Sequence, residues 1–271
     1  MKNGMNSVKM VAVDMDGTFL RSDNTYDRSR FESILKRMRS QKAKFVVASG
    51  NQYYQLRDFF PADHQQLAFV AENGAFVKDK DTMIFSQQIS KEVVEKVIDL
   101  CLGHPEIDML MCGLDSAYCQ KGTVSQELFE IMSIYYHRLK WVDDLKSVQD
   151  QILKFALTTP AGLETEICDL LKQELNGLLD PVTSGHRSID LIVPGCHKAS
   201  GLKQLAERWQ FDPKDCAAFG DSANDIEMLQ YCGHSYAMAN ADEAVKQAAR
   251  SICPSNNEDG VLAVLDELYP A

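Results

Sequence analysis

The sequence predicts an α/β fold in which a doubly wound, Rossmann-like parallel sheet carries an inserted α+β unit. Short apolar runs alternate with amphipathic helical patterns in the first third of the chain, and the same alternation returns in the last third. The segment between them orders its elements differently. We therefore predict a core formed by residues 1–83 and 189–271 and an inserted unit of residues 84–188, which together account for the 271 residues.

The first third begins with the apolar run Val8–Val13, which has the length and composition of a buried parallel strand. Apolar residues then recur at helical spacing over 31–38 with charged residues between them, which predicts an amphipathic helix packed on the sheet. Further strands are expected at 45–48 and 68–71, and residues 72–74 form a turn signal. This order predicts a βαβ unit.

The last third repeats this pattern. Strands are expected at 189–193, 216–219, 236–238 and near 252, and helices at 202–209, 225–230, 242–249 and 261–268. In the middle segment, helices are expected at 89–102, 125–136 and 167–175, and strands at 109–112 and 155–158. None of the strand ends in this segment carries a pair of carboxylates, so the chemistry is expected in the core.

The composition limits the possible partners. The net charge of −11 disfavours a nucleic-acid partner, because a phosphate backbone needs a basic surface. No apolar run could cross a bilayer and no signal-peptide pattern begins the chain, so we expect a cytoplasmic protein without a membrane partner. The eight scattered cysteines form no CxxC pair and are expected to be buried reduced thiols. The oligomeric state is not predicted.

Polar groups follow the predicted core strands. Asp14 and Asp16 come directly after the first strand, and Ser49-Gly50-Asn51 follows the second. Lys198 stands shortly after the strand at 189–193, and Gly220-Asp221-Ser222-Ala223-Asn224-Asp225 follows the strand at 216–219. Ligands bind at the carboxyl ends of strands in open α/β sheets. Two neighbouring acids there repel each other without a cation, which indicates a metal site and chemistry on a phosphate.

These segments resemble the four motifs of the haloacid dehalogenase superfamily of phosphatases, with DMDGT as the first, ASGN as the second, Lys198 as the third and GDSAND as the fourth. The string GDSANDIEML resembles the Cof-type branch, whose members are cytoplasmic sugar-phosphate phosphatases with a large cap. Segments 47–56 and 70–75 are similar to enterobacterial sugar phosphatases of that branch. The resemblance implies a Mg²⁺-dependent phosphatase of small phosphorylated sugars, with the inserted unit as a cap that sets specificity.

Phosphoryl transfer needs a nucleophile, charge neutralisation and a proton donor. The motifs imply Asp14 as nucleophile and Asp16 as general acid and base, with Lys198 stabilising the charge that develops. The expected Mg²⁺ ligands are Asp14, the Asp16 backbone carbonyl and Asp221. The expected phosphate-binding residues are Ser49, Gly50, Asn51, Lys198 and Asn224, with Asp225 anchoring Lys198.

Two points concern substrate contacts. Many relatives carry arginine where this chain has Asn51, so an arginine contact to the substrate is not expected here. In the inserted unit, Tyr118, His137 and His186 could touch a sugar, although each also fits an ordinary surface or structural role.

Alternative interpretations remain. Asp14-x-Asp16-Gly17 could begin a calcium loop, but a helix should precede such a loop and a glutamate should complete it. A phosphotransferase or mutase of the same superfamily would use the same motifs. A response-regulator receiver also places acids and a lysine on a parallel sheet, but receivers are much shorter and need no Asp16.

Overall fold

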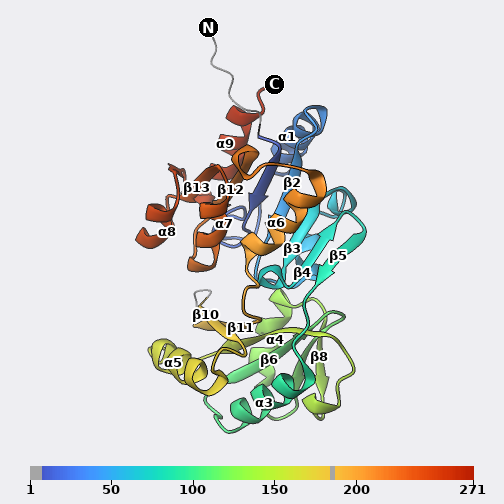
Figure 1. Cartoon of the computed structure of the whole chain (residues 1–271), viewed down its shortest axis with the longest axis vertical. Helices are drawn as coiled ribbons and strands as arrows, with labels where there is room; N and C mark the ends of the chain where they lie inside the picture. Colours follow the sequence, from blue (N-terminus) through green and yellow to red (C-terminus); the bar gives the residue numbers. More distant parts are fainter. Residues whose placement is uncertain (1–7, 184–186) are drawn as a thin grey trace.

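The protein is described by a computed structural model that covers residues 8–183 and 187–271. Within these residues the chain forms an eight-stranded sheet and a six-stranded sheet. Figure 1 shows the two sheets in separate units, with the core unit above the inserted unit and the C-terminus at the far end of the core. The predicted α/β architecture, a Rossmann-like core with an inserted unit, is confirmed.

The core sheet is formed by β1 (Met10–Val13), β2 (Lys44–Ala48), β3 (Ala68–Ala71), β4 (Phe76–Asp79), β5 (Thr82–Ser86), β12 (Cys216–Gly220), β13 (His234–Met238) and β14 (Ser251–Cys253). Their order in the sheet is β14-β13-β12-β1-β2-β3-β4-β5. The strands from β14 to β3 run parallel, as predicted. Strands β4 and β5, which were not predicted, add an antiparallel hairpin at the β3 edge.

Helices cover both faces of this sheet. They are α1 (Arg28–Ser40), α2 (Tyr53–Asp58), α6 (Lys198–Trp209), α7 (Ile226–Tyr231), α8 (Glu243–Ala248) and α9 (Gly260–Leu268). Helix α1 contacts α9, whereas α6 contacts α7 and α7 contacts α8. Every residue of β1 is buried, because a central parallel strand is covered on both faces. This burial places the carboxyl end of β1 in the middle of the molecule.

The inserted unit contains β6 (Asp108–Gly113), β7 (Ala117–Gln120), β8 (Leu139–Val142), β9 (Ile152–Thr158), β10 (Asp180–Thr183), β11 (Ser188–Ile192), α3 (Lys91–Leu102), α4 (Gln126–Tyr135) and α5 (Glu164–Leu175). Its strand order is β10-β11-β9-β6-β7-β8. The predicted helices and the strands near 109 and 155 are confirmed, and β7, β8 and β10 were not predicted.

The predicted boundaries of the inserted unit are wrong by a few residues at each end. Strand β5 still belongs to the core sheet, and Ile89 is the first residue that bonds to β9. On the return, β11 pairs with β9 and β10, so 188–192 belong to the inserted sheet and not to the core. The apolar run 189–193 looks the same in either sheet, and only its antiparallel pairing distinguishes them. The connections lie at 87–88 and 193–197.

The two faces of the inserted sheet have different environments. Met109, Met111, Phe155 and Leu157 pack with α3 and α5 in one apolar cluster. The residues between them face the opposite side, because side chains alternate along a strand. Charged side chains lie among these alternating residues: Lys154 stands between buried Leu153 and Phe155, and Asp190 stands between Ile189 and Leu191.

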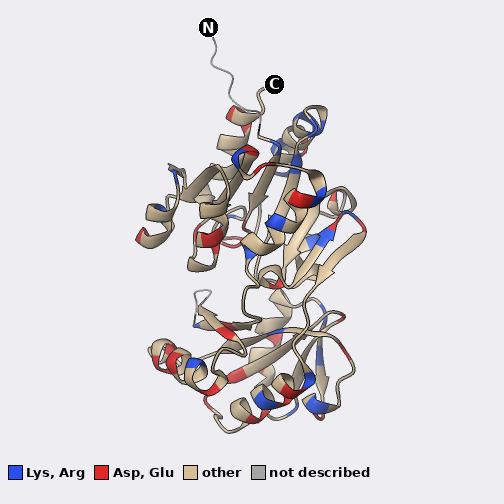
Figure 2. Ribbon diagram, in the orientation of Figure 1, with Lys and Arg blue, Asp and Glu red and all other residues tan. Residues whose placement is uncertain are grey.

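The cysteines, the hydropathy of the helices and the distribution of charge can be compared with the expectations from composition. All eight cysteines are buried and unpaired, which confirms the prediction of reduced thiols. In the described part of the chain, none of the helices combines the length and the hydropathy needed to cross a membrane. Figure 2 shows Lys and Arg interspersed with Asp and Glu over both units.

Candidate active site

Asp14 occupies the centre of the core sheet. It directly follows β1, and its backbone N–H donates a hydrogen bond to the carbonyl of Phe219 in β12, at 3.1 Å. The residue is only 6% exposed. Burial is the main cause that raises the pKa of its carboxyl well above the ordinary value; Lys198 opposes this shift, whereas Asp225 and Asp221 add to it. A cation at this position would favour the ionised form.

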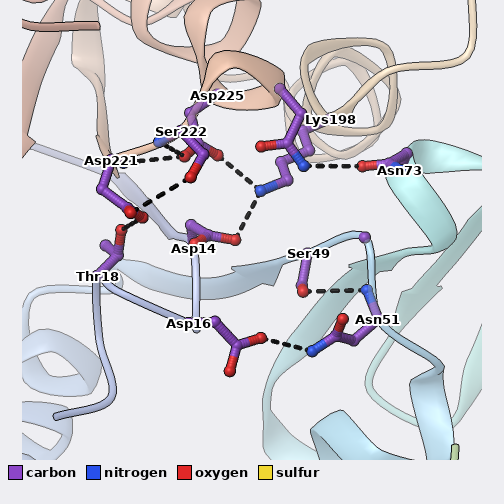
Figure 3. Close-up of polar contacts among 12 residues, drawn as sticks. Asp14, Asp16, Thr18, Ser49, Asn51, Asn73, Lys198, Asp221, Ser222 and Asp225 are labelled. Atoms are coloured by element: carbon purple, nitrogen blue, oxygen red, sulfur yellow. Dashed lines mark hydrogen bonds and ion pairs between the residues drawn. The ribbon is translucent and has the colours of Figure 1, made fainter. Parts of the chain in front are cut away.

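Lys198 approaches Asp14 from α6 (Figure 3). It is the first residue of that helix and is 1% exposed. Its Nζ lies 2.6 Å from Asp14 Oδ1 and 2.6 Å from Asp225 Oδ1. Burial alone would lower the pKa of this ammonium group, but the two carboxylates outweigh burial and the pKa is raised. Lys198 is therefore a permanent positive charge beside Asp14.

The loop after β12 supplies the other acids. Asp225 is fully buried, and its Oδ2 accepts hydrogen bonds from the backbone N–H groups of Asp221 (2.9 Å) and Ser222 (3.0 Å). Because Asp225 is bonded at both oxygens, it anchors Lys198 and the loop. The Thr18 hydroxyl donates to Asp221 Oδ1 at 2.7 Å. Burial raises the pKa of Asp221, the Thr18 hydrogen bond lowers it, and the charge of Asp225 raises it further.

The carboxylates fit a divalent cation. Asp14, Asp221 and Asp225 each offer an oxygen within 4.8 Å of the others. Asp221 also lies against the backbone after Asp16, since a Cβ built on Gly17 would meet Asp221 Oδ2 at 2.4 Å. Gly17 has a φ of +75°, so two constraints favour glycine there. An all-oxygen site with few carboxylates suits Mg²⁺.

Asp16 and the loop after β2 lie on the other side of Asp14 (Figure 3). Asp16 is exposed, and its Oδ2 accepts a hydrogen bond from Asn51 Nδ2 at 2.6 Å. Ser49 is buried, and its Oγ accepts from the backbone N–H of Asn51 at 3.1 Å. The predicted arginine-free loop thus contacts Asp16 through an amide, a contact that the sequence analysis did not foresee.

The predicted site residues are brought together by different routes. Asp14, Asp221 and Lys198 converge directly, whereas Asn224 donates to Asn73 Oδ1 at 3.2 Å and lines the same cavity as Lys198. The expectation that Lys198 follows a strand of the core sheet was wrong, because the strand before it, β11, belongs to the inserted sheet. Lys198 is positioned by the start of α6. The His197 imidazole caps this helix, and its Nδ1 accepts a hydrogen bond from the Ser200 N–H at 3.1 Å.

Two of the three candidate sugar contacts, Tyr118 and His137, lie in the described part of the chain. The Tyr118 hydroxyl donates to Asp150 at 2.8 Å within the inserted unit. His137 pairs with Asp58 of α2 at 2.8 Å and so links the two units. His186 lies outside the described residues.

A second charged cluster, which was not predicted from the sequence, lies beside the site. Lys154 and Asp190 of the inserted sheet contact Glu72, Asn73 and Gly50 of the core. From the sequence, residues 72–74 are expected only to form a turn. Two signals were available: a carboxylate directly after a buried strand, and single charges between apolar residues in two strands.

A small cavity adjoins Lys198. It has a volume of about 130 Å³ and is lined from the core by Asn73, Lys198 and Asn224 and from the inserted unit by residues such as Val182 and Ile192. The buried lysine therefore borders a space between the two units that could accommodate part of a small ligand.

A Rossmann-like core with an inserted unit and a buried aspartate–lysine cluster at its carboxyl edge defines a class of α/β hydrolases that act on phosphate esters. The chain belongs to the haloacid dehalogenase-like hydrolases, whose family profile matches residues 11–265. It is a phosphoric monoester hydrolase.

Two relatives are named for the same activity. The chain is 43% identical to the 5-amino-6-(5-phospho-D-ribitylamino)uracil phosphatase YbjI of Escherichia coli, over 97% of this chain and 96% of that protein. It is 25% identical to YitU of Bacillus subtilis, which carries the same description, over 96% of this chain and 97% of that one. Among solved structures, SMU.1108c of Streptococcus mutans superposes with a TM-score of 0.93 at 37% identity, covering 98% of this chain and all of the other.

Proposed function

We propose that this phosphatase is Mg²⁺-dependent and hydrolyses small phosphorylated sugars and sugar alcohols through a phosphoryl group carried on Asp14. The observation that carries the proposal is the contact of the buried Asp14 with Lys198, beside Asp221 and Asp225. A nucleophilic carboxylate must sit where the phosphate's negative charge is neutralised. This cluster supplies one fixed ammonium group and a set of oxygens suited to a cation.

The proposed first step is attack by an Asp14 oxygen on phosphorus, which breaks the bond to the leaving oxygen. Asp16 gives its proton to that oxygen and is held by Asn51 at 2.6 Å. Lys198 neutralises charge on Asp14 and on the phosphoryl oxygens. Ser49, Gly50 and Asn224 complete the proposed phosphate site. In the second step Asp16 takes a proton from water, which attacks phosphorus and releases Asp14.

The proposed cation site consists of Asp14, the Asp16 backbone carbonyl and Asp221. When bound there, Mg²⁺ would reduce the repulsion between the carboxylates and the phosphate and orient the two. The Thr18 hydroxyl holds Asp221 by donating to its Oδ1, and the Ser222 hydroxyl donates to Asp221 Oδ2 at 3.3 Å.

The proposed substrate class follows from both the motifs and the relatives. Both named relatives act on a compound whose phosphate is carried by a ribityl chain, which is a sugar alcohol. That compound is the first to test here, together with the sugar phosphates that the Cof-type resemblance suggests. The inserted unit is proposed to act as the cap that sets specificity, since the cavity beside Lys198 is lined by both units.

The test is phosphate release by the purified chain from 5-amino-6-(5-phospho-D-ribitylamino)uracil and from hexose, pentose and nucleotide monophosphates. Each compound is assayed with Mg²⁺ and with a chelator, and Asp14→Asn is the control. Release that needs both Mg²⁺ and Asp14 supports the proposal. Absence of Mg²⁺-dependent release across the panel contradicts it, and isomer formation with an added bisphosphorylated sugar would indicate a mutase.

A further inference from the structure

A buried cluster of charges joins the inserted unit to the core outside the metal and nucleophile site. Lys154 of β9 is 2% exposed, and its Nζ lies 2.9 Å from Asp190 Oδ1 in neighbouring β11. The same Nζ donates to the Gly50 carbonyl at 2.8 Å and lies 3.6 Å from Glu72 Oε2. One lysine of the inserted unit therefore bonds to the backbone of the proposed phosphate loop.

The contact to Gly50 acts on the peptide that orients Asn51. The Gly50 carbonyl and the Asn51 N–H belong to the same planar peptide unit. Lys154 holds the carbonyl end, and Ser49 Oγ accepts from the N–H end at 3.1 Å. The Asn51 carbonyl is also held, by the N–H of Glu72, so the backbone on both sides of the Asn51 Cα is fixed and sets the direction of its Cα–Cβ bond. That side chain bonds to Asp16.

A second set of contacts holds the same loop from its other side. Asn73 Nδ2 donates to Asp190 Oδ2 at 2.6 Å, and a Cβ on Gly50 would lie 3.1 to 3.3 Å from these two side chains. The backbone N–H of Asn73 donates to the Ser49 carbonyl, and that of Glu72 to the Asn51 carbonyl. The loop is thus enclosed by β9, β11 and the turn at 72–74.

The cluster contains strained backbone and buried charge, both of which are energetically unfavourable. Glu72 and Asn73 have φ of 51° and 53°, a left-handed conformation that is unfavourable for side-chain-bearing residues. Glu72 Oε2 is buried and has no hydrogen-bond partner within the described residues. Apolar residues would join two units at lower cost than buried ions. Strain and buried charge of this kind are typical of functional positions.

We propose that Lys154 is a positioning residue: held by Asp190, it fixes the Gly50–Asn51 peptide so that Asn51 keeps Asp16 aligned for proton transfer. The inserted unit thereby contributes to proton donation without touching the reacting atoms. This inference rests on the proposed function, since it concerns the role of Asp16 there.

The test uses the leaving-group dependence of kcat/KM, which reports the first step and is not limited by the second step that the two esters share. An alkyl phosphate needs a proton on its departing oxygen, whereas 4-nitrophenolate leaves without one. Lys154→Met should lower kcat/KM for the best alkyl phosphate of the panel by about tenfold or more and leave kcat/KM for 4-nitrophenyl phosphate within about threefold. Asp16→Asn should show the same selectivity, and adding Lys154→Met to Asp16→Asn should cause no further selective loss. Lys172→Met, at an exposed position of α5, is the control.

Because Lys154→Met leaves Asp190 buried without its partner, the double variant Lys154→Met/Asp190→Asn is measured beside it. Selective loss with the alkyl ester in either folded variant supports the inference. Equal losses of kcat/KM with both esters would indicate a purely structural role and overturn it, as would an unchanged kcat/KM. A wild-type protein that releases phosphate from neither ester refutes the proposed function itself, whereas an active wild type with unselective variants refutes only the role of Lys154.

Discussion

The side chain of Asp14 lies beside one positive charge, Lys198, and two negative ones, Asp221 and Asp225. Lys198 is the one ammonium group that contacts it among the described residues, while Asp221 and Asp225 raise its pKa together with burial. The folded protein without a cation therefore disfavours the ionised form of the proposed nucleophile. This imbalance leads to predictions for individual side chains.

Asp14→Asn should abolish turnover, by at least about a thousandfold, because an amide cannot act as the nucleophile. The same change should not lower the melting temperature in Mg²⁺-free buffer, since it removes one of the crowded charges and Lys198 retains Asp225. Thermal unfolding and phosphate release on one preparation test both parts. A melting temperature many degrees lower would contradict the second part.

Thr18→Val should weaken Mg²⁺ binding without removing a proposed ligand. The hydroxyl that orients Asp221 is lost while the shape of the side chain is kept. We expect the Mg²⁺ concentration for half-maximal activity to rise by about tenfold to a hundredfold. Titration of activity with Mg²⁺ measures this, and Thr25→Val, at an exposed position, is the control. An unchanged Mg²⁺ dependence would show that Thr18 does not support the cation site.

Glu72→Gln should change how stability depends on pH. Burial raises the pKa of Glu72 from 4.5 to about 7, Lys154 opposes the shift, and Asp190 adds to it. A raised pKa means that the folded chain holds this proton more tightly than the unfolded chain. The contribution to stability is therefore complete below pH 4.5 and is lost as the pH rises through 7, by about 3 kcal/mol in all.

The glutamine variant keeps the neutral form at every pH. Denaturant unfolding from pH 5 to pH 8 should therefore show a smaller loss of stability with rising pH in the variant, which should be the more stable protein at pH 8. Parallel curves for the two proteins would mean that Glu72 does not titrate in this range.

At the scale of elements, the start of α6 carries the third motif. Gly74 has a φ of +93°, and a Cβ there would lie 2.4 Å from the His197 carbonyl, just before Lys198. The turn after β3 and the first turn of α6 thus pack backbone against backbone. This packing could not be derived from periodicity, because the turn and the helix are far apart in sequence.

Gly74→Ala should therefore disturb both the turn and the position of Lys198. We expect a loss of stability of about 2 kcal/mol or more, from the left-handed backbone and the clash with His197. Activity of the folded variant should also fall, whereas Gly162→Ala, whose Cβ would meet nothing within 4 Å, should affect stability through its backbone only. Equal stability losses in the two variants would contradict the packing argument.

Local patterns predicted most elements of this fold. Fully buried strands such as β1 and amphipathic helices such as α1 have clear periodicity. Strands β4 and β8 were missed because they are short and mix charged with apolar residues. The acids after β1 and β12 could be located because parallel strand ends converge, but the contacts of Asn51, Lys154 and Glu72 depend on tertiary packing between the two units.

At the scale of the whole molecule, two units share one site. The sequence predicted the insertion, yet it placed β11 in the core because an apolar strand does not reveal which sheet it joins. That strand and β9 bring Asp190 and Lys154 against the loop that holds Asp16. The proposed chemistry thus depends on side chains from both units.

The measurement that tests this account most directly is a search for the phosphoryl group on Asp14. Asp16→Asn, mixed with 4-nitrophenyl phosphate and Mg²⁺, should release 4-nitrophenolate in a burst of about one per chain, because the second step lacks its base. Mass spectrometry after acid quenching should then find the phosphoryl group on the peptide that contains Asp14. A phosphoryl group on another residue, or steady release without a burst or any modified peptide, would contradict the account.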